Sequence, residues 1–155
     1  MKRMMLVAAA VALAGCVVID KSAPSAFAPP GLDPKNPNVF VVTNGATACA
    51  DKRAVIVVDQ EPIYFFMRGH SQAFPITWHL QTRGYSFAQQ ANIADPTPYE
   101  KSYATGEITN CRAGGQSMTC TNKNQNSGYW KYTLSIRADD GCGNPPDLDP
   151  LIGND

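Results

Sequence analysis

From residue 38 onward, the sequence is a succession of short apolar segments separated by turn-forming residues, and this pattern limits the fold more than any other feature. Residues 76–80 alternate apolar and polar side chains, and residues 130–137 do so over a longer stretch. An alternation of period two gives a β-strand one apolar face. Weaker or more continuous strand candidates are residues 39–43, 54–58, 62–67, 85–87, 107–109 and 117–121.

Helices are not expected in this region. The best helical window, residues 85–94, does not keep a 3.6-residue period, and Pro96 and Pro98 block its continuation. One helical turn between residues 87 and 94 is the most that this window allows. About seven or eight short strands with turns between them are typical of a β-sandwich.

The fold prediction is therefore an all-β, antiparallel β-sandwich, with a small open β-barrel as the alternative. Trp78 lies on a central alternating strand, which resembles the buried tryptophan of immunoglobulin-like sandwiches. Cys49 precedes the first long strand, so the cysteine spacing of true immunoglobulin domains is only partly met. Alternation predicts that Lys131 faces solvent and that five residues form the core: Trp78, Leu80, Tyr132, Leu134 and Ile136.

The N-terminus has the features of an export signal. Lys2 and Arg3 precede an unbroken apolar run of 11 residues, 4–14. This run is too short for a transmembrane helix, which needs about 20 residues, and it fits a signal h-region of about 7–15 residues. The run ends in a sequence that resembles the lipobox of bacterial lipoproteins: Leu13-Ala14-Gly15-Cys16.

The lipobox resemblance implies a membrane anchor. In that family the chain is cleaved before the cysteine, here after Gly15, and Cys16 carries a diacylglyceryl thioether, usually with acylation of the new N-terminus. Two or three acyl chains, at about 0.8 kcal/mol per buried CH₂, anchor a protein stably. Val17, not Asp, follows the cysteine. In enteric-type sorting this favours the outer membrane, facing the periplasm; the outer leaflet of the inner membrane and the cell surface are the alternatives.

Four segments follow from these features. We expect a signal peptide at residues 1–15, a lipidated proline-rich tether at 16–37, the β-sandwich at 38–143 and a flexible tail at 144–155. Removing the signal peptide with its two basic residues leaves 11 basic and 13 acidic residues, a net charge of 11 − 13 = −2. The chain has no basic patch, which argues against nucleic acid as a partner.

Once Cys16 is assigned to lipid, an even number of cysteines remains. Cys49, Cys111, Cys120 and Cys142 would lie in an oxidising compartment, so two disulfides are expected. Three connectivities are possible, and we favour Cys111–Cys120 with Cys49–Cys142. The first pair needs a wide loop of eight residues, because a tight turn at residues 113–115 would place Gln116 opposite Cys111. No C-x₂-C pair is present, so a metal site is not expected.

The sequence gives little support for a catalytic function. The two histidines are His70, in a loop, and His79, on the polar face of a strand. The sequence lacks a nucleophile elbow, a zinc-protease motif and a phosphate-binding glycine loop. Asp139, Asp140, Asp147 and Asp149 have no calcium-loop register and are expected to form a solvated acidic group. We predict neither enzymatic activity nor a cofactor.

The amide-rich loop at residues 121–130 is the candidate binding site. Its candidate contact residues are Asn124, Asn126, Tyr129 and Trp130, with Trp130 expected to point outward at the edge of the sandwich. The predicted function is a non-catalytic envelope module that contacts the membrane through lipid on Cys16 and acts by contact with another envelope protein. The alternative is a small-ligand or glycan binder that uses this loop.

Overall fold

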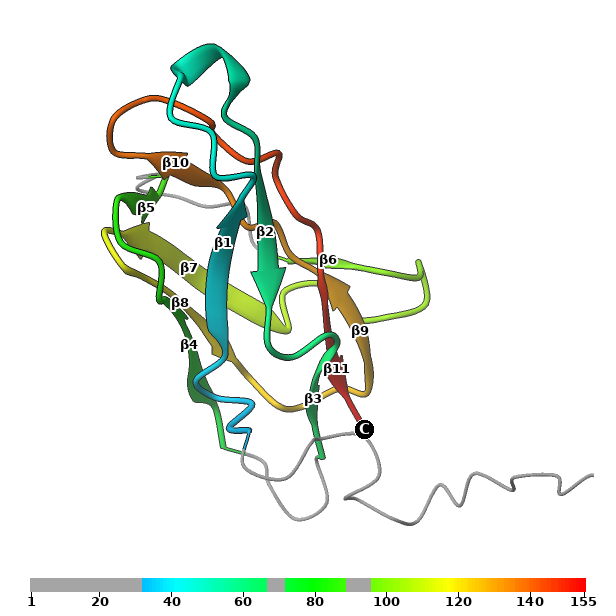
Figure 1. Cartoon of the computed structure of the whole chain (residues 1–155). Helices are drawn as coiled ribbons and strands as arrows, with labels where there is room; N and C mark the ends of the chain where they lie inside the picture. The colour runs from blue at the N-terminus through cyan, green and yellow to red at the C-terminus, as the bar shows by residue number, and fades with distance from the viewer. Residues whose placement is uncertain (1–31, 67–71, 89–95) are drawn as a thin grey trace, which may run out of the picture.

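The computed structural model describes residues 32–66, 72–88 and 96–155, and this part of the chain is all-β (Figure 1). It contains eleven strands and one turn of 3-10 helix. In chain order these elements are β1 (Asn38–Thr43), η1 (Cys49–Asp51), β2 (Ala54–Val58), β3 (Ile63–Phe65), β4 (Phe74–Leu80), β5 (Tyr85–Phe87), β6 (Thr97–Pro98), β7 (Ile108–Gly114), β8 (Ser117–Asn122), β9 (Gly128–Lys131), β10 (Ile136–Ala138) and β11 (Leu151–Asn154).

The largest sheet has five strands in the order β2-β1-β4-β8-β7. β1 pairs with β2 in antiparallel register along its length, from Val39 opposite Val58 to Thr43 opposite Ala54. On its other side β1 runs parallel to β4. β4, β8 and β7 are successive antiparallel neighbours. β2 is therefore one edge of this sheet, and β7 is the other.

A second sheet has four strands in the order β3-β11-β9-β6, and β5 pairs with β10 in a separate two-stranded sheet. β11 runs parallel to β3 and antiparallel to β9. The sheets are mixed and do not close into a barrel, so the predicted all-β sandwich architecture is confirmed over the open barrel. The expectation of purely antiparallel pairing was wrong, because the β1–β4 and β3–β11 pairs are parallel.

Apolar side chains from the sheets meet in one core. The predicted core residues are all buried there: Trp78, Leu80, Tyr132, Leu134 and Ile136. Ile63, Ile76, Ile108 and Ile152 complete its centre with no exposed surface. Lys131 lies on the exposed side, as the alternation predicted.

The stretch predicted as one strand over residues 130–137 is divided between two sheets. β9 ends at Lys131, and β10 begins at Ile136. Between them, the Tyr132 amide donates to Pro150 O, and Leu134 forms an isolated bridge with Leu148. The alternation persists across the break, so the side chains keep the predicted facing although the backbone changes partners.

Both favoured disulfides are present, Cys49–Cys142 and Cys111–Cys120. The expected wide loop was wrong. The β7–β8 hairpin turns between Gly114 and Ser117, which are register partners, and Arg112 is paired with Thr119, so the next residues along the two strands are Cys111 and Cys120. The Cα atoms of that pair are 4.1 Å apart. A register shift between Thr109 and Arg112 then restores the pairing further along the hairpin.

The expected flexible tail at residues 144–155 contains a strand of the four-stranded sheet. β11 lies between β3 and β9, and Ile152 and Asn154 are buried. The prolines of this segment end at Pro150, and the strand begins at the next residue, Leu151. A four-residue strand with a central glycine gives too weak a pattern to be recognised from the sequence.

The end of the expected tether also belongs to the folded domain. Thr77 N donates to Lys35 O at 2.8 Å, and His79 N donates to Pro37 O at 2.9 Å. The Gln60 side chain donates to Asp33 O at 3.0 Å. The domain therefore begins by about residue 33, because the carbonyls of Lys35 and Pro37 extend the parallel pairing with β4 and the carbonyl of Asp33 binds Gln60.

Several sequence-based expectations concern residues outside the described ranges. These are the signal peptide, the lipobox with Cys16, the tether up to residue 31, His70, and the helical turn from residue 89 onward. Within the described residues, no helix has the length and hydropathy needed to cross a membrane.

Candidate functional site

The amide-rich loop at residues 121–130 is organised around a buried carboxylate. Glu107 is 1% exposed. Its Oε1 accepts hydrogen bonds from the backbone N–H groups of Gln125 and Asn126, and its Oε2 accepts one from Asn126 Nδ2 at 2.7 Å. A buried carboxylate needs such donors, because charge-assisted hydrogen bonds offset the loss of hydration.

Two further amides extend this network into the core. Asn122 Nδ2 donates to Asn154 Oδ1 at 2.8 Å, and Asn154 Nδ2 donates back to Asn122 Oδ1 at 3.1 Å. The backbone N–H of Asn124 also donates to Asn122 Oδ1, and Asn124 adopts a left-handed φ of 54° that asparagine tolerates. Asn124 is 1% exposed. Asn122 and Asn124 therefore belong to the buried network, whereas the candidate residue Asn126, which donates to Glu107, lies at the exposed surface of the loop.

Trp130 is fully buried, so the expectation that it points outward was wrong. Its Nε1 donates to Ala104 O at 2.9 Å, and its ring centroid lies 6.2 Å from that of Tyr103. Trp130 and Tyr132 share the inner face in ordinary alternation, so no bulge or overhanging edge is needed. Of the neighbouring residues Tyr129 and Trp130, Tyr129 is the one that points outward, and it is half-buried.

Tyr129 belongs to a small aromatic cluster on the outer side of the four-stranded sheet. Its ring centroid lies 6.2 Å from that of Tyr64, which lies 5.0 Å from Phe66. The rings cover Gly153, where an added Cβ would lie 2.7 Å from Tyr64 and 2.8 Å from Tyr129. Burial, followed by contact with Tyr129 and Asp155, raises the pKa of Tyr64 to about 12. The aromatic cluster therefore shields the middle of the outer face of this sheet from solvent.

The titratable groups singled out in the sequence are not gathered at one place. His79 Nε2 lies 3.3 Å from Asn36 Oδ1. The acidic residues have separate local partners, which are Ser86 for Asp139, Lys52 for Asp140, Arg137 for Asp147, and Lys131 with Thr133 for Asp149. In the described part of the chain, no group of three or more His, Cys, Asp and Glu residues is arranged to hold a metal ion.

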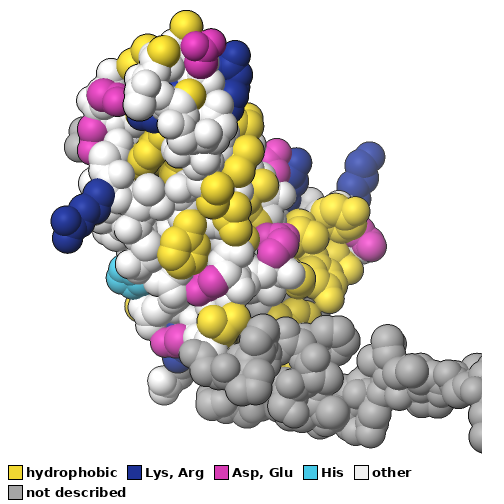
Figure 2. Space-filling view, in the orientation of Figure 1, with side chains coloured by type: hydrophobic (Ala, Val, Ile, Leu, Met, Phe, Trp, Pro, Cys, Tyr) yellow, Lys and Arg dark blue, Asp and Glu magenta, His cyan; other side chains and the backbone are white. Residues whose placement is uncertain are grey.

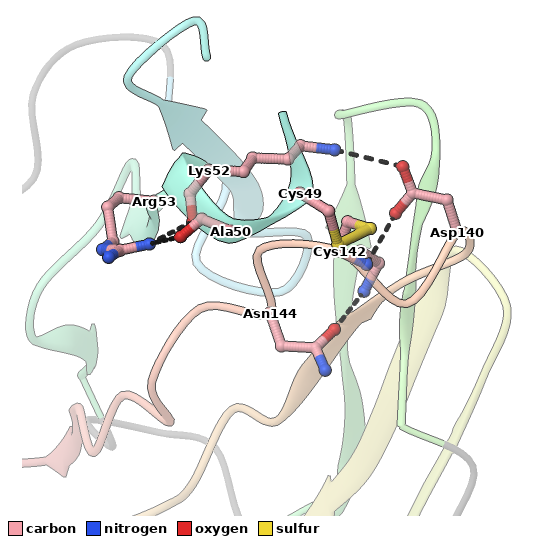
Figure 3. Close-up of a disulfide and its surroundings, with 8 residues drawn as sticks. Cys49, Ala50, Lys52, Arg53, Asp140, Cys142 and Asn144 are labelled. Atoms are coloured by element: carbon pink, nitrogen blue, oxygen red, sulfur yellow. Dashed lines mark hydrogen bonds and ion pairs between the residues drawn. A yellow bond between two sulfur atoms is a disulfide. The ribbon is translucent and has the colours of Figure 1, made fainter. Parts of the chain in front are cut away.

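One of these acids lies at the Cys49–Cys142 disulfide (Figure 3). Asp140 Oδ1 accepts the backbone N–H of Cys142 at 2.9 Å, and its Oδ2 forms an ion pair with Lys52 Nζ at 3.2 Å. These two interactions lower the pKa of Asp140 below its ordinary value. Together with the disulfide, they join the β1–β2 connection to the segment that follows β10.

An apolar strip crosses the outer face of β1 and β2, and sequence reasoning did not identify it. We define the apolar strip as Phe40, Val42, Val55 and Val57, which are 39, 53, 52 and 43% exposed. Phe40 is the register partner of Val57, and Val42 is that of Val55, so the four side chains form two adjacent cross-strand pairs. Figure 2 shows hydrophobic side chains gathered over β1 and β2 on the face toward the viewer.

A signal for this strip was present in the sequence. Residues 39–42 and 54–58 are apolar without interruption, unlike the alternating strand at 76–80. A continuous apolar run is ordinarily interpreted as a strand buried on both faces. Here only one face is buried, by Val39, Val41, Ala54 and Ile56. The other face is left in solvent.

Compared with known proteins, the chain matches no protein-family model and no characterised protein.

Proposed function

We propose that this protein is a lipid-anchored, non-catalytic module of the bacterial cell envelope that acts by protein–protein contact. In this proposal Cys16 carries the lipid, and the folded domain faces the periplasm from the outer membrane. The apolar strip is the observation that carries the proposal. Large contiguous apolar surfaces on soluble domains are typical of interaction sites, whereas isolated exposed apolar residues need no explanation.

The hydrogen-bond and ion-pair partners of the polar groups support a contact function over a catalytic one. Glu107, the fully buried acid among the described residues, is engaged by backbone and side-chain donors. His79 and the acidic residues at the surface have separate partners spread over several elements. A hydrolytic mechanism needs a nucleophile, a base and an orienting group within hydrogen-bond reach of one another.

A ligand- or glycan-binding role is the second candidate, and Tyr129 is the observation that favours it. Tyr129 remains at the surface beside Tyr64, while Asn124 and Trp130 are buried. Sugars stack on aromatic faces, but the rings of this pair are tilted by 48° and cover Gly153. The geometry therefore supports this role less well than it supports contact through the apolar strip.

In-cell photo-crosslinking tests the proposal. A photoreactive phenylalanine analogue in place of Val42 should form a discrete adduct in growing cells, because this position is 53% exposed and is the most exposed of the strip. The matched control carries the analogue in place of Lys131, on the exposed side of β9. Equal, diffuse labelling from the two positions in correctly localised protein would contradict a role for the strip.

A further inference from the structure

Among the described residues, β2 has a neighbour on one side only, so its other hydrogen-bonding edge is unoccupied there. The bonds from Asn44 N to Arg53 O and from Asp59 N to Asn38 O fix which residues of β2 point their backbone groups toward β1. By the alternation of an antiparallel ladder, Val55 and Val57 also bond to β1, whereas Ala54, Ile56 and Val58 direct their N–H and C=O groups away from it. No described residue bonds to these outward groups.

Within the part of the chain that the structure describes, this edge lacks the usual protection against strand pairing. Natural edge strands are blunted by proline, bulges, inward-pointing charges or a covering element. The sequence of β2 is Ala-Val-Ile-Val-Val, without a charge or a proline, and its pairing with β1 is regular over all five residues. An unprotected apolar edge is stable in a native protein when a partner strand occupies it.

We propose that β2 pairs in antiparallel orientation with β2 of a second copy of this chain, forming a two-fold dimer with a continuous ten-stranded sheet. The inference rests on the proposed contact function and names the partner of that surface. A two-fold axis at Ile56 places Ala54 opposite the partner's Val58. It also leaves the outward N–H and C=O groups of both strands in hydrogen-bonding positions.

The residues that flank β2 carry opposite charges at matching distances from Ile56. Arg53 precedes the centre by three positions, and Asp59 follows it by three. In the two-fold arrangement, Arg53 of each copy is directly opposite the partner's Asp59 on the solvent face that also carries Val55 and Val57. Asp59 is already oriented, because its carboxylate accepts hydrogen bonds from Asn38 N at 2.9 Å and Asn38 Nδ2 at 2.7 Å.

The apolar strip becomes continuous in the same arrangement. Val55 is opposite the partner's Val57 in a non-hydrogen-bonded pair, where side chains approach most closely. Phe40 and Val42 flank these pairs on the neighbouring β1 strands. A strand from an unrelated protein would need to reproduce this apolar and charge pattern, whereas a second copy supplies it by symmetry.

A charge-swap experiment on the full, lipidated chain in detergent tests the register. By analytical ultracentrifugation, the wild type should sediment as a dimer at micromolar concentration. Arg53→Glu, which sets two carboxylates opposite each other twice per dimer, should raise the dimer dissociation constant by about tenfold or more. Asp59→Lys should do the same, because it sets an ammonium group opposite the partner's Arg53. An equimolar mixture of the two variants should restore the dimer, because unlike charges then face each other at both ends of the paired strands and the like charges of the homodimers are avoided.

Two matched substitutions distinguish edge pairing from nonspecific hydrophobic association through the apolar strip. Val55→Lys adds a charge on the pairing strand, and Val42→Lys adds the same charge at nearly equal exposure on β1. The first should weaken the dimer, and the second should change it little. Equal losses would overturn edge pairing, as would a wild type that stays monomeric at about 100 µM. If adducts to another protein still form at position 42, the contact function stands and only the second copy is excluded.

Discussion

The indole Nε1 of Trp78 donates a 3.0 Å hydrogen bond to the hydroxyl of Tyr132 in the middle of the core. The two ring centroids are 4.9 Å apart, and both residues are buried. The hydrogen bond links β4 of the five-stranded sheet to the segment between β9 and β10. Burial raises the pKa of Tyr132 well above its ordinary value, more than the hydrogen bond from Trp78 lowers it, so this hydroxyl stays neutral.

Tyr132→Phe should therefore lower the free energy of unfolding by about 1–3 kcal/mol, because it leaves the indole N–H of Trp78 buried without an acceptor. Chemical denaturation measures the loss. The matched control is Tyr99→Phe, since Tyr99 is 64% exposed and should change stability little. A neutral Tyr132→Phe substitution would show that water or another group accepts the indole N–H.

The two disulfides should differ in what they contribute. Cys49–Cys142 closes a loop with a sequence separation of 93, and Cys111–Cys120 closes one of 9. In the loop-entropy description, the long loop is worth about 4–5 kcal/mol and the short one about 2–3 kcal/mol. Paired Cys→Ser variants, compared by chemical denaturation, should follow that order. The reverse order would mean that strain or residual structure in the unfolded chain outweighs loop entropy.

Glu107→Gln should destabilise the fold by about 2–4 kcal/mol, because one carboxylate oxygen becomes an NH₂ group that faces the N–H donors of Gln125 and Asn126. Hydrogen exchange should show the loss of protection first in the 122–126 segment and in β11, which share the network through Asn154. The comparison variant is Glu100→Gln, on the exposed surface. Equal effects of the two changes would contradict a structural role for the buried carboxylate.

Stability should fall at alkaline pH because of Tyr64. Its pKa is raised from 10.0 to about 12, chiefly by burial. The unfolded chain loses this proton first, so the stabilisation is fully present below pH 10 and is lost as pH rises toward 12. Unfolding measured at several pH values in that window should show a shallower decline for Tyr64→Phe than for the wild type. Parallel declines would assign the pH dependence to other groups.

Cys16→Ala should abolish lipidation and leave the chain unprocessed, because the proposed thioether forms on this sulfur. Metabolic labelling with radioactive palmitate, followed by membrane fractionation, measures both effects. Cys49→Ala is the control, since it removes a disulfide cysteine and should retain label. Palmitate on the Cys16→Ala protein would exclude the lipobox assignment.

Side-chain facing was predictable wherever the two faces of a strand differ. The alternation at Tyr132, Leu134 and Ile136 identified the buried face correctly, although the backbone changes sheets between them. Alternation reports only which side of a segment meets the core, whereas the choice of pairing partner depends on distant parts of the chain. This is why the parallel β1–β4 and β3–β11 pairs could not be predicted.

Polar residues were harder to interpret because their burial depends on a distant partner. Asn124 and Asn126 are residue types typical of an exposed turn. Asn124 is nevertheless buried, where its backbone N–H binds Asn122, and Asn126 donates to the buried Glu107. In the same way, Gly153 suggested coil because its sequence context does not show that Tyr64 and Tyr129 cover it. The apolar strip was not predicted, because both faces of these strands are apolar and the sequence does not show which face is exposed.

The position of β11 within its sheet also limits the order in which the strands of the domain can pair during folding. β3 emerges early during synthesis, yet its hydrogen-bonding neighbour is β11, which follows every other strand of that sheet in the chain. Pairings between distant segments form slowly, because the intervening chain must be closed into a large loop first. An incomplete chain would expose the inner faces of β3 and β9 together. Folding of this sheet should therefore wait until Leu151–Asn154 has been synthesised, and a nascent chain that lacks this strand should depend on holding factors.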